Sequence, residues 1–271
     1  MNILNSILIF TMLVFSTGIQ ASDLAKEQRW ADQVVDAILD GEAVWLNDGN
    51  NKFLGIDTEA GEDKGRAVIV MHGTGIHPDW QQVIQPLRVG LTEHNWNTLS
   101  IQMPILPNEA EYPEYAPLYD EVAPRIDAAI KYLKDNGAKE IVLIGHSQGA
   151  AMSAYYLSTS EQDVKGFVAI GMASFADDPR MNSIKALENI KLPVLDIYGD
   201  DDLEGIMKSV GARAEAAKRP AIRITPSRKS QDPTISLMAR KLNWSKLSVS
   251  YTHLRAHETV RWISYAVFCL K

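Results

Sequence analysis

The stretch EIVLIGHSQGAAMSA, Glu140 to Ala154, decides the fold, because it leads an apolar strand through a Gly-His-Ser-Gln-Gly turn into small residues. Such a short, continuous apolar run is typical of a strand buried in a parallel sheet. The turn would hold Ser147 in a strained conformation at the end of this strand, and Gly145 and Gly149 would let strand and helix approach closely. The following helix would point its N-terminus at developing negative charge. The stretch therefore predicts a serine nucleophile.

The rest of the chain alternates predicted strands and helices. Apolar runs predict strands at RAVIVMHG (66–73), NTLSIQMP (97–104), GFVAIGMA (166–173) and LPVLDIYG (192–199). Helical spacing of apolar residues predicts helices over 26–39, 80–93, 119–135, 147–157 and 206–218. AVWLNDGNNKFLGIDTE (43–59) predicts an edge hairpin, and the Pro- and Glu-rich segment 104–117 predicts a loop over a pocket. This order predicts an α/β fold, with a mostly parallel sheet and helices on both of its faces.

A second turn follows the strand that starts at residue 66, and it reads His72-Gly73-Thr74-Gly75. Its backbone N–H groups near Thr74, together with that of Gln148, are candidates for an oxyanion hole. Gly73 and Gly75 are also what a tight strand-to-helix turn requires, and the two interpretations are compatible. His72 is expected to shape this turn rather than to take part in proton transfer.

The other histidines of the first 218 residues are weaker candidates for the catalytic base. His146 is expected to face the pocket, but it is too close in sequence to the serine to act as its base. His77 and His94 are most simply turn and surface residues. The set of His72, His77 and Asp79 lacks the pattern of a metal site, so neither a metal nor an organic cofactor is expected.

Three consecutive carboxylates, Asp200, Asp201 and Asp202, follow the strand PVLDIYG. At least one of them should hydrogen-bond an imidazole and stabilise the imidazolium that forms when a serine loses its proton. The others are expected to lie in a solvated acidic turn. Asp196, which alternates within the strand, is expected to be structural.

The N-terminal residues 1–21 have the pattern of a secretory signal peptide. An apolar run from Ile7 to Phe15 is too short to span a bilayer, and small and polar residues follow it up to a cleavage site near Ala21. We therefore expect a periplasmic or secreted protein without a stable membrane span after cleavage. The only cysteine is Cys269, which excludes a cysteine nucleophile or a thiolate metal site in the body of the chain.

The span from about Trp30 to Lys218 resembles the α/β-hydrolase superfamily, and more narrowly an exported bacterial group known as domain of unknown function 3530. The stretches FLGI, VIVMHGTGIHPDW, LSIQMPIL, IGHSQGA and PVLDIYGDDDL carry this resemblance. It implies an α/β-hydrolase fold with Ser147 as nucleophile and Asp202 as the acid, Asp201 being the second choice. It also implies a histidine that follows one more strand.

The histidines after the acidic turn are His253 and His257, and both lie in VSYTHLRAHET. This string is what a common sequencing-library adapter encodes, and ISYAVFCL (263–270) is what the far end of the same adapter encodes. We therefore interpret residues 248–271, including Cys269, as adapter-derived. Neither histidine is then the catalytic base.

Residues 219–247 are interpreted as a frameshifted remnant of the core domain, which would span residues 22–218. In a shifted frame, DPTISLMARKLNWSKL (232–247) permits Asn-His-Phe-Phe followed by an acidic helix, which resembles the missing end of the family. The distribution of charge agrees with this interpretation. Residues 1–218 carry 17 Lys and Arg against 32 Asp and Glu, whereas residues 219–271 carry 10 Lys and Arg against 2 Asp and Glu. A genuine basic tail would instead suggest nucleic-acid binding. With the frameshift, no nucleic-acid partner is expected.

These patterns predict an exported serine hydrolase that cleaves an ester or related acyl bond of a small or lipid-like substrate with a Ser-His-Asp triad. The present chain would lack the last strand, the last helix and the histidine, and would be nearly inactive. The alternative is a non-catalytic α/β-hydrolase-like binding module of the cell envelope, because a fold does not by itself fix a function. The sequence does not predict the oligomeric state.

Overall fold

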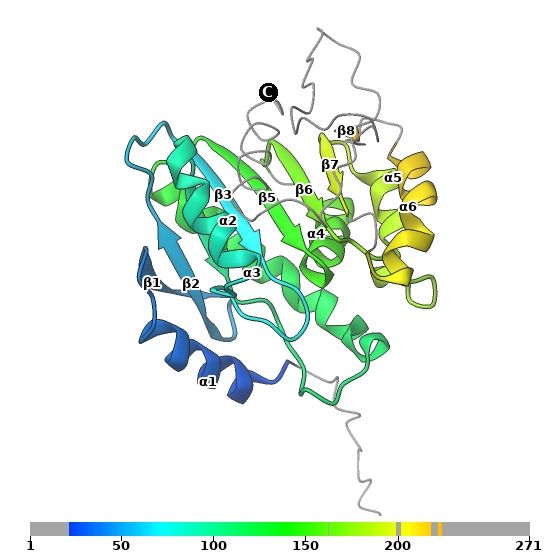
Figure 1. Cartoon of the computed structure of the whole chain (residues 1–271), viewed down its shortest axis with the longest axis horizontal. Helices are drawn as coiled ribbons and strands as arrows, with labels where there is room; N and C mark the ends of the chain where they lie inside the picture. The colour runs from blue at the N-terminus through cyan, green and yellow to red at the C-terminus, as the bar shows by residue number, and fades with distance from the viewer. Residues whose placement is uncertain (1–21, 162, 199–201, 218–221, 224–271) are drawn as a thin grey trace, which may run out of the picture.

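The computed structural model describes residues 22–161, 163–198, 202–217 and 222–223. Within them the chain forms an eight-stranded sheet in the order β1-β2-β4-β3-β5-β6-β7-β8 (Figure 1). The strands are β1 (Glu42–Asn47), β2 (Lys52–Thr58), β3 (Arg66–Met71), β4 (Asn97–Ile101), β5 (Glu140–His146), β6 (Gly166–Ile170), β7 (Val194–Ile197) and β8 (Ile222–Arg223). Strands β3 to β8 pair in parallel, whereas β1 and β2 form the antiparallel hairpin at one edge.

The connections are mainly helical. The α-helices are α1 (Leu24–Val35), α2 (Ile84–Gly90), α3 (Val122–Asp135), α4 (Gln148–Thr159), α5 (Ser183–Asn189) and α6 (Glu204–Ala216), and the 3₁₀ segments are η1 (Thr92–His94), η2 (Tyr112–Glu121) and η3 (Pro179–Met181). Helix α5 was not predicted, because it is short. It begins where the Asn182 side chain accepts the Lys185 N–H at 3.0 Å, which caps its first turn.

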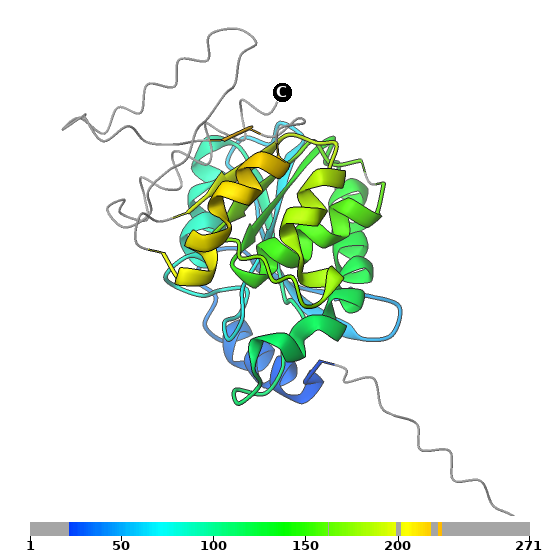
Figure 2. The same ribbon diagram turned by 90° about the vertical axis from the view of Figure 1, so that its right-hand side faces the viewer.

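Alternation along β3 divides the core between the two faces of the sheet. Ala67, Ile69 and Met71 pack with residues of α3 and α4, and Val68 and Val70 pack with residues of α2. Helices therefore cover both faces of the sheet, as the view along its edge shows (Figure 2). The predicted α/β fold is confirmed, including the mostly parallel sheet and the edge hairpin.

Segment 104–117, predicted as a loop, enters η2 at Tyr112. Buried side chains of η2, including Tyr115 and Tyr119, pack into the same core as α3 and α4. This segment is thus a packed part of the domain between β4 and α3. The proposed signal peptide and the proposed frameshifted and adapter-derived segments lie outside the described residues, apart from β8.

Candidate active site

Ser147 occupies the tight turn between β5 and α4. Its φ of 53° and ψ of −119° place its backbone in a region that residues other than glycine rarely adopt. Among the described non-glycine residues only Asn95 shares a positive φ. A conformation of this kind costs on the order of 1–3 kcal/mol and persists where the surrounding structure imposes it. The Ser147 N–H is held by the Ile170 carbonyl oxygen of β6 at 2.7 Å.

Three glycines make room for this turn. A Cβ on Gly145 would lie 2.6 Å from the backbone nitrogen of Ala150 in α4. A Cβ on Gly149 would lie 2.7 Å from the Met71 carbonyl oxygen at the end of β3. A Cβ on Gly73 would lie 2.8 Å from the Cβ of Ser147. Real Cβ contacts under 3.0 Å are essentially never seen, so side chains here would force strand, helix and turn apart.

We call His72–Gly75 the oxyanion turn, and it lies directly beside Ser147. The Thr74 hydroxyl donates a hydrogen bond to Oε1 of Gln148, which joins the turn to the start of α4. Gln148 is the first residue of that helix, so its N–H has no acceptor within the helix. Gly75 has a φ of +72° and completes the turn. The structure thus brings together the residues predicted for the oxyanion hole.

His72 is fully buried and holds the oxyanion turn in place. Its Nδ1 lies 2.9 Å from the Gly73 carbonyl oxygen, and its Nε2 lies 2.9 Å from the backbone nitrogen of Met103. This pairing requires the proton on Nδ1, because the N–H of Met103 needs an acceptor. Burial lowers the pKa of His72 to about 3. The ring is therefore neutral near pH 7. It links the oxyanion turn to the segment that follows β4.

His146 lies directly before Ser147 and is partly buried. Its Nδ1 has no hydrogen-bond partner among the described residues. Burial lowers the pKa of His146 to about 4, against an opposing effect of the Asp202 carboxylate. A neutral imidazole with an unused nitrogen is thus part of the site, although it does not come from the position expected of a catalytic base.

Asp202 lies near the carboxyl ends of the strands, on the side of the sheet that also carries Ser147. A Cβ added to Gly171, just after β6, would lie 3.7 Å from Oδ2 of Asp202. The other oxygen, Oδ1, accepts the N–H of Leu203 at 2.8 Å. Asp200, Asp201, His253 and His257 lie outside the described residues. Of the predicted triad, the structure therefore places the serine and one acid.

The remaining sequence candidates have structural contacts. Asp196 accepts a hydrogen bond from Nε of the buried Arg213 in α6 at 2.9 Å. Asp79 accepts one from Nε of Arg88 at 2.7 Å. The His77 ring makes edge contacts with Trp30 and Trp80. Within the part of the chain that the structure describes, no group of three or more His, Cys, Asp or Glu side chains is arranged to hold a metal ion.

Sequence reasoning missed a set of buried polar residues beside the site. Gln102 follows β4, and its amide nitrogen lies 3.0 Å from Nε2 of His72. Arg125 of α3 is fully buried and pairs with Glu27 of α1 at 2.9 Å. The sequence did contain a signal for the burial of Arg125. This residue falls on the apolar face of its helix, between Val122 and Ala129 in the helical repeat.

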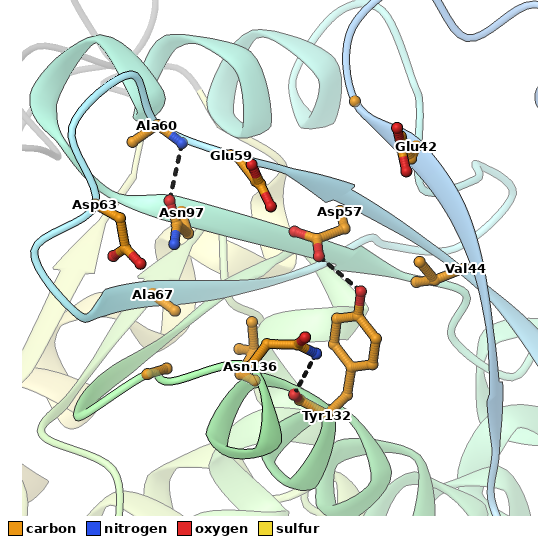
Figure 3. A pocket seen from close by; sticks show the side chains of 13 residues that line it. Glu42, Val44, Asp57, Glu59, Ala60, Asp63, Ala67, Asn97, Tyr132 and Asn136 are labelled. Atoms are coloured by element: carbon orange, nitrogen blue, oxygen red, sulfur yellow. Dashed lines mark hydrogen bonds between the residues drawn. The ribbon is translucent and has the colours of Figure 1, made fainter.

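One cavity among the described residues lies away from Ser147. It has a volume of about 510 Å³ and opens between β2 and the end of α3 (Figure 3). Ala67 and Asn97 line it, and both lie at the amino ends of their strands, opposite the edge that carries Ser147. Its other polar lining includes Glu42, Asp57, Glu59, Asp63, Tyr132 and Asn136.

The described helices offer no membrane span, since none is both long enough and apolar enough to cross a bilayer.

The sheet order, the strained serine turn and the flanking helices define an α/β-hydrolase fold. Similar solved structures agree: Est1E from Butyrivibrio proteoclasticus (14% identity, 84% of this chain and 97% of that chain, TM-score 0.56) and an alpha-beta serine hydrolase homologue from Coxiella burnetii (15%, 85% and 97%, 0.57). The Pyrococcus furiosus esterase Pf2001 is 22% identical over 66% of this chain and 79% of that chain, with a TM-score of 0.53. At these identities the similarity establishes the fold.

The chain belongs to the family described as protein of unknown function (DUF3530), which matches residues 20–124 and 117–223. No curated protein matches it.

Proposed function

We propose that the natural protein is a serine hydrolase that cleaves an ester or related acyl bond. The observation that carries this proposal is the backbone of Ser147, whose positive φ is sustained by glycines on both sides and by the neighbouring oxyanion turn. Strain of this kind in a strand-to-helix turn raises a hydroxyl above the edge of the sheet, where a substrate can reach it. The Pyrococcus furiosus neighbour is named an esterase and the Coxiella burnetii neighbour is named a serine hydrolase homologue, which supports the same class of reaction.

In this mechanism the Ser147 hydroxyl attacks the acyl carbon while a histidine takes its proton, and the acid stabilises the imidazolium. Asp202 is the proposed acid, since it lies at the edge of the sheet that carries the serine. The oxyanion receives hydrogen bonds from the backbone N–H groups of Thr74 and Gln148. The histidine returns the proton to the leaving group, and water then cleaves the acyl-enzyme.

The present chain is proposed to be nearly inactive, because its reading frame would change near Arg219 and the catalytic histidine would be lost. The abrupt basic character of residues 219–271 supports a change of frame. Loss of a triad histidine costs on the order of a million-fold in turnover. The natural protein is further proposed to be exported, on the strength of residues 1–21.

Resequencing the gene and labelling its full-length product with a serine-directed fluorophosphonate test the proposal together. The product of the resequenced gene should be labelled at Ser147, and the Ser147→Ala variant should not. The present chain should be labelled far more slowly. A folded product that is not labelled, and whose ligand binding survives Ser147→Ala, would favour the alternative of a binding module.

A further inference from the structure

We propose that helix α1 belongs to the catalytic machinery of the hydrolase, with Glu27 and Arg125 as positioning residues for the oxyanion turn. The inference rests on the proposed function, because the position of this turn affects turnover only if Ser147 attacks an acyl group.

The first turn of α1 is bonded to the segment that follows β4. The Asp23 N–H donates to the Ile105 carbonyl oxygen at 2.7 Å, and the Ile105 N–H donates to Oε1 of Glu27 at 3.3 Å. Nζ of Lys26 donates to the Leu106 carbonyl oxygen at 2.7 Å. These bonds cross about eighty positions of sequence, so α1 fixes the path of a segment that it does not adjoin in the chain.

Arg125 connects this helix to the end of β4. Its Nη1 lies 2.9 Å from Oε2 of Glu27, and its Nη2 lies 3.2 Å from Oε1, so the pair is bidentate. Nη1 also donates to the Gln102 carbonyl oxygen at 3.1 Å. Arg125 is 0% exposed and Glu27 is 5% exposed. Charges this deeply buried hold their geometry firmly, because neither partner can be solvated if they separate.

Gln102 and Met103 carry the connection to His72. The Gln102 amide nitrogen lies 3.0 Å from Nε2 of His72 and 2.7 Å from the Met103 carbonyl oxygen. The Met103 N–H lies 2.9 Å from the same Nε2. The Gln102 amide and the Met103 N–H thus both contact Nε2 of His72. Because Arg125 holds the backbone at Gln102, it determines the position of the His72 ring.

The last link joins His72 to the nucleophile. Nδ1 of His72 bonds the Gly73 carbonyl oxygen, and at Gly73 even one added carbon would lie 2.8 Å from the Cβ of Ser147. The turn has little freedom on this side. A displacement of about 1 Å at a catalytic group can cost on the order of a hundred-fold in rate.

The test variant replaces both charges at once, as Glu27→Met with Arg125→Met, in the full-length product of the resequenced gene. Removing both avoids leaving one buried charge unpaired, and apolar replacements of similar volume are often tolerated. Asp48, which lies 3.6 Å from Arg125, still accepts the N–H groups of Asn50 and Asn51. For ester hydrolysis we expect kcat to fall by about 10- to 100-fold, with KM changed less than about twofold.

Tyr132→Phe is the matched control. Tyr132 lies in α3 with Arg125, and its hydroxyl bonds Asp57 at 2.7 Å, but it lines the cavity at the opposite edge of the sheet. It should leave kcat unchanged. Within the pair, Glu27→Gln with Arg125 retained should recover part of the kcat that the double variant loses, because the amide oxygen still accepts from the guanidinium.

A second readout does not depend on hydrolysis. In protein labelled with ¹⁵N-histidine, NMR should show His72 as the neutral tautomer with the proton on Nδ1, and the double variant should change these signals while Tyr132→Phe does not. Unchanged His72 signals, or an unchanged kcat in a folded double variant, would overturn the positioning role. If the unsubstituted enzyme hydrolyses no ester, the proposed function fails instead, and the NMR result alone decides whether α1 controls the turn.

Discussion

The two ends of the parallel strands are built in different ways. We call the side of the sheet where β5 and β6 end the carboxyl edge, and the side where β3 and β4 begin the amino edge. At the carboxyl edge, Ser147 has a strained backbone, and glycines beside it have no room for a side chain. At the amino edge lies a cavity of about 510 Å³, where Asp57 and Tyr132 share a hydrogen bond (Figure 3). The presence of this cavity would direct attention to the amino edge. Strain and close packing direct it to the carboxyl edge, because a costly conformation persists only where the structure imposes it.

The largest effect should come from Ser147→Ala in the product of the resequenced gene. We expect turnover to fall on the order of a million-fold, because the nucleophile is removed and only binding and oxyanion contacts remain. Steady-state ester hydrolysis measures this. Substitutions that line the amino-edge cavity should leave hydrolysis intact, and a similar loss from Asp57→Asn would show that the edges are coupled.

Gly149→Ala should cost about 3 kcal/mol or more of unfolding free energy, because its Cβ would press against the carbonyl oxygens of Met71 and His72. Chemical denaturation of the full chain measures the loss. Gly211→Ala in α6 is the control: a Cβ there meets nothing within 4 Å. A comparable loss in both variants would contradict the packing argument.

Acid should destabilise the protein through the imidazole of His146 at the carboxyl edge. The pKa of His146 falls from its ordinary 6.5 to about 4 in the folded state, so the unfolded chain binds the proton first as pH drops. Stability from this group is complete above about pH 6.5 and is lost as the pH falls towards 4. Between pH 7 and pH 5 the loss is about 2 kcal/mol.

Denaturation at the two pH values, with wild type and His146→Phe compared, measures this contribution. The variant should lose less stability on acidification than the wild type does. The same slope in both proteins would show that His146 is not held neutral by burial.

Tyr132→Phe should have a smaller effect, about 1 kcal/mol of stability, because it removes one partly buried hydrogen bond at the amino edge. Thermal unfolding and hydrolysis measured on the same sample check it. A loss of hydrolysis without a loss of stability would mean that the amino edge takes part in function.

The smallest expected effect is a gain from Gly211→Ala, roughly 0.5–1 kcal/mol, because alanine favours the helix more than glycine does. The midpoint of denaturation shows it. A decrease would mean that α6 is less regular at this position than its hydrogen bonds indicate.

Local patterns were enough to predict most of the fold. The run Glu140–Ala154 specified a buried strand, a turn and a helix, and the hairpin at 43–59 appeared as β1 and β2. Helix boundaries were less predictable: the helix expected over 80–93 is divided into α2 and η1. Segment 104–117 had no periodicity, yet η2 packs there, because its buried tyrosines find partners on distant elements.

The sequence by itself determined that the chain folds as an α/β domain and that Ser147 stands at the carboxyl end of a central strand. These features follow from short-range apolar periodicity and from glycines at fixed offsets. Only the tertiary structure decided that His72 is a buried link and that Gln102, Arg125 and Glu27 connect it to α1. Those contacts join residues up to 98 positions apart, and no local pattern encodes which polar side chains meet when the elements pack.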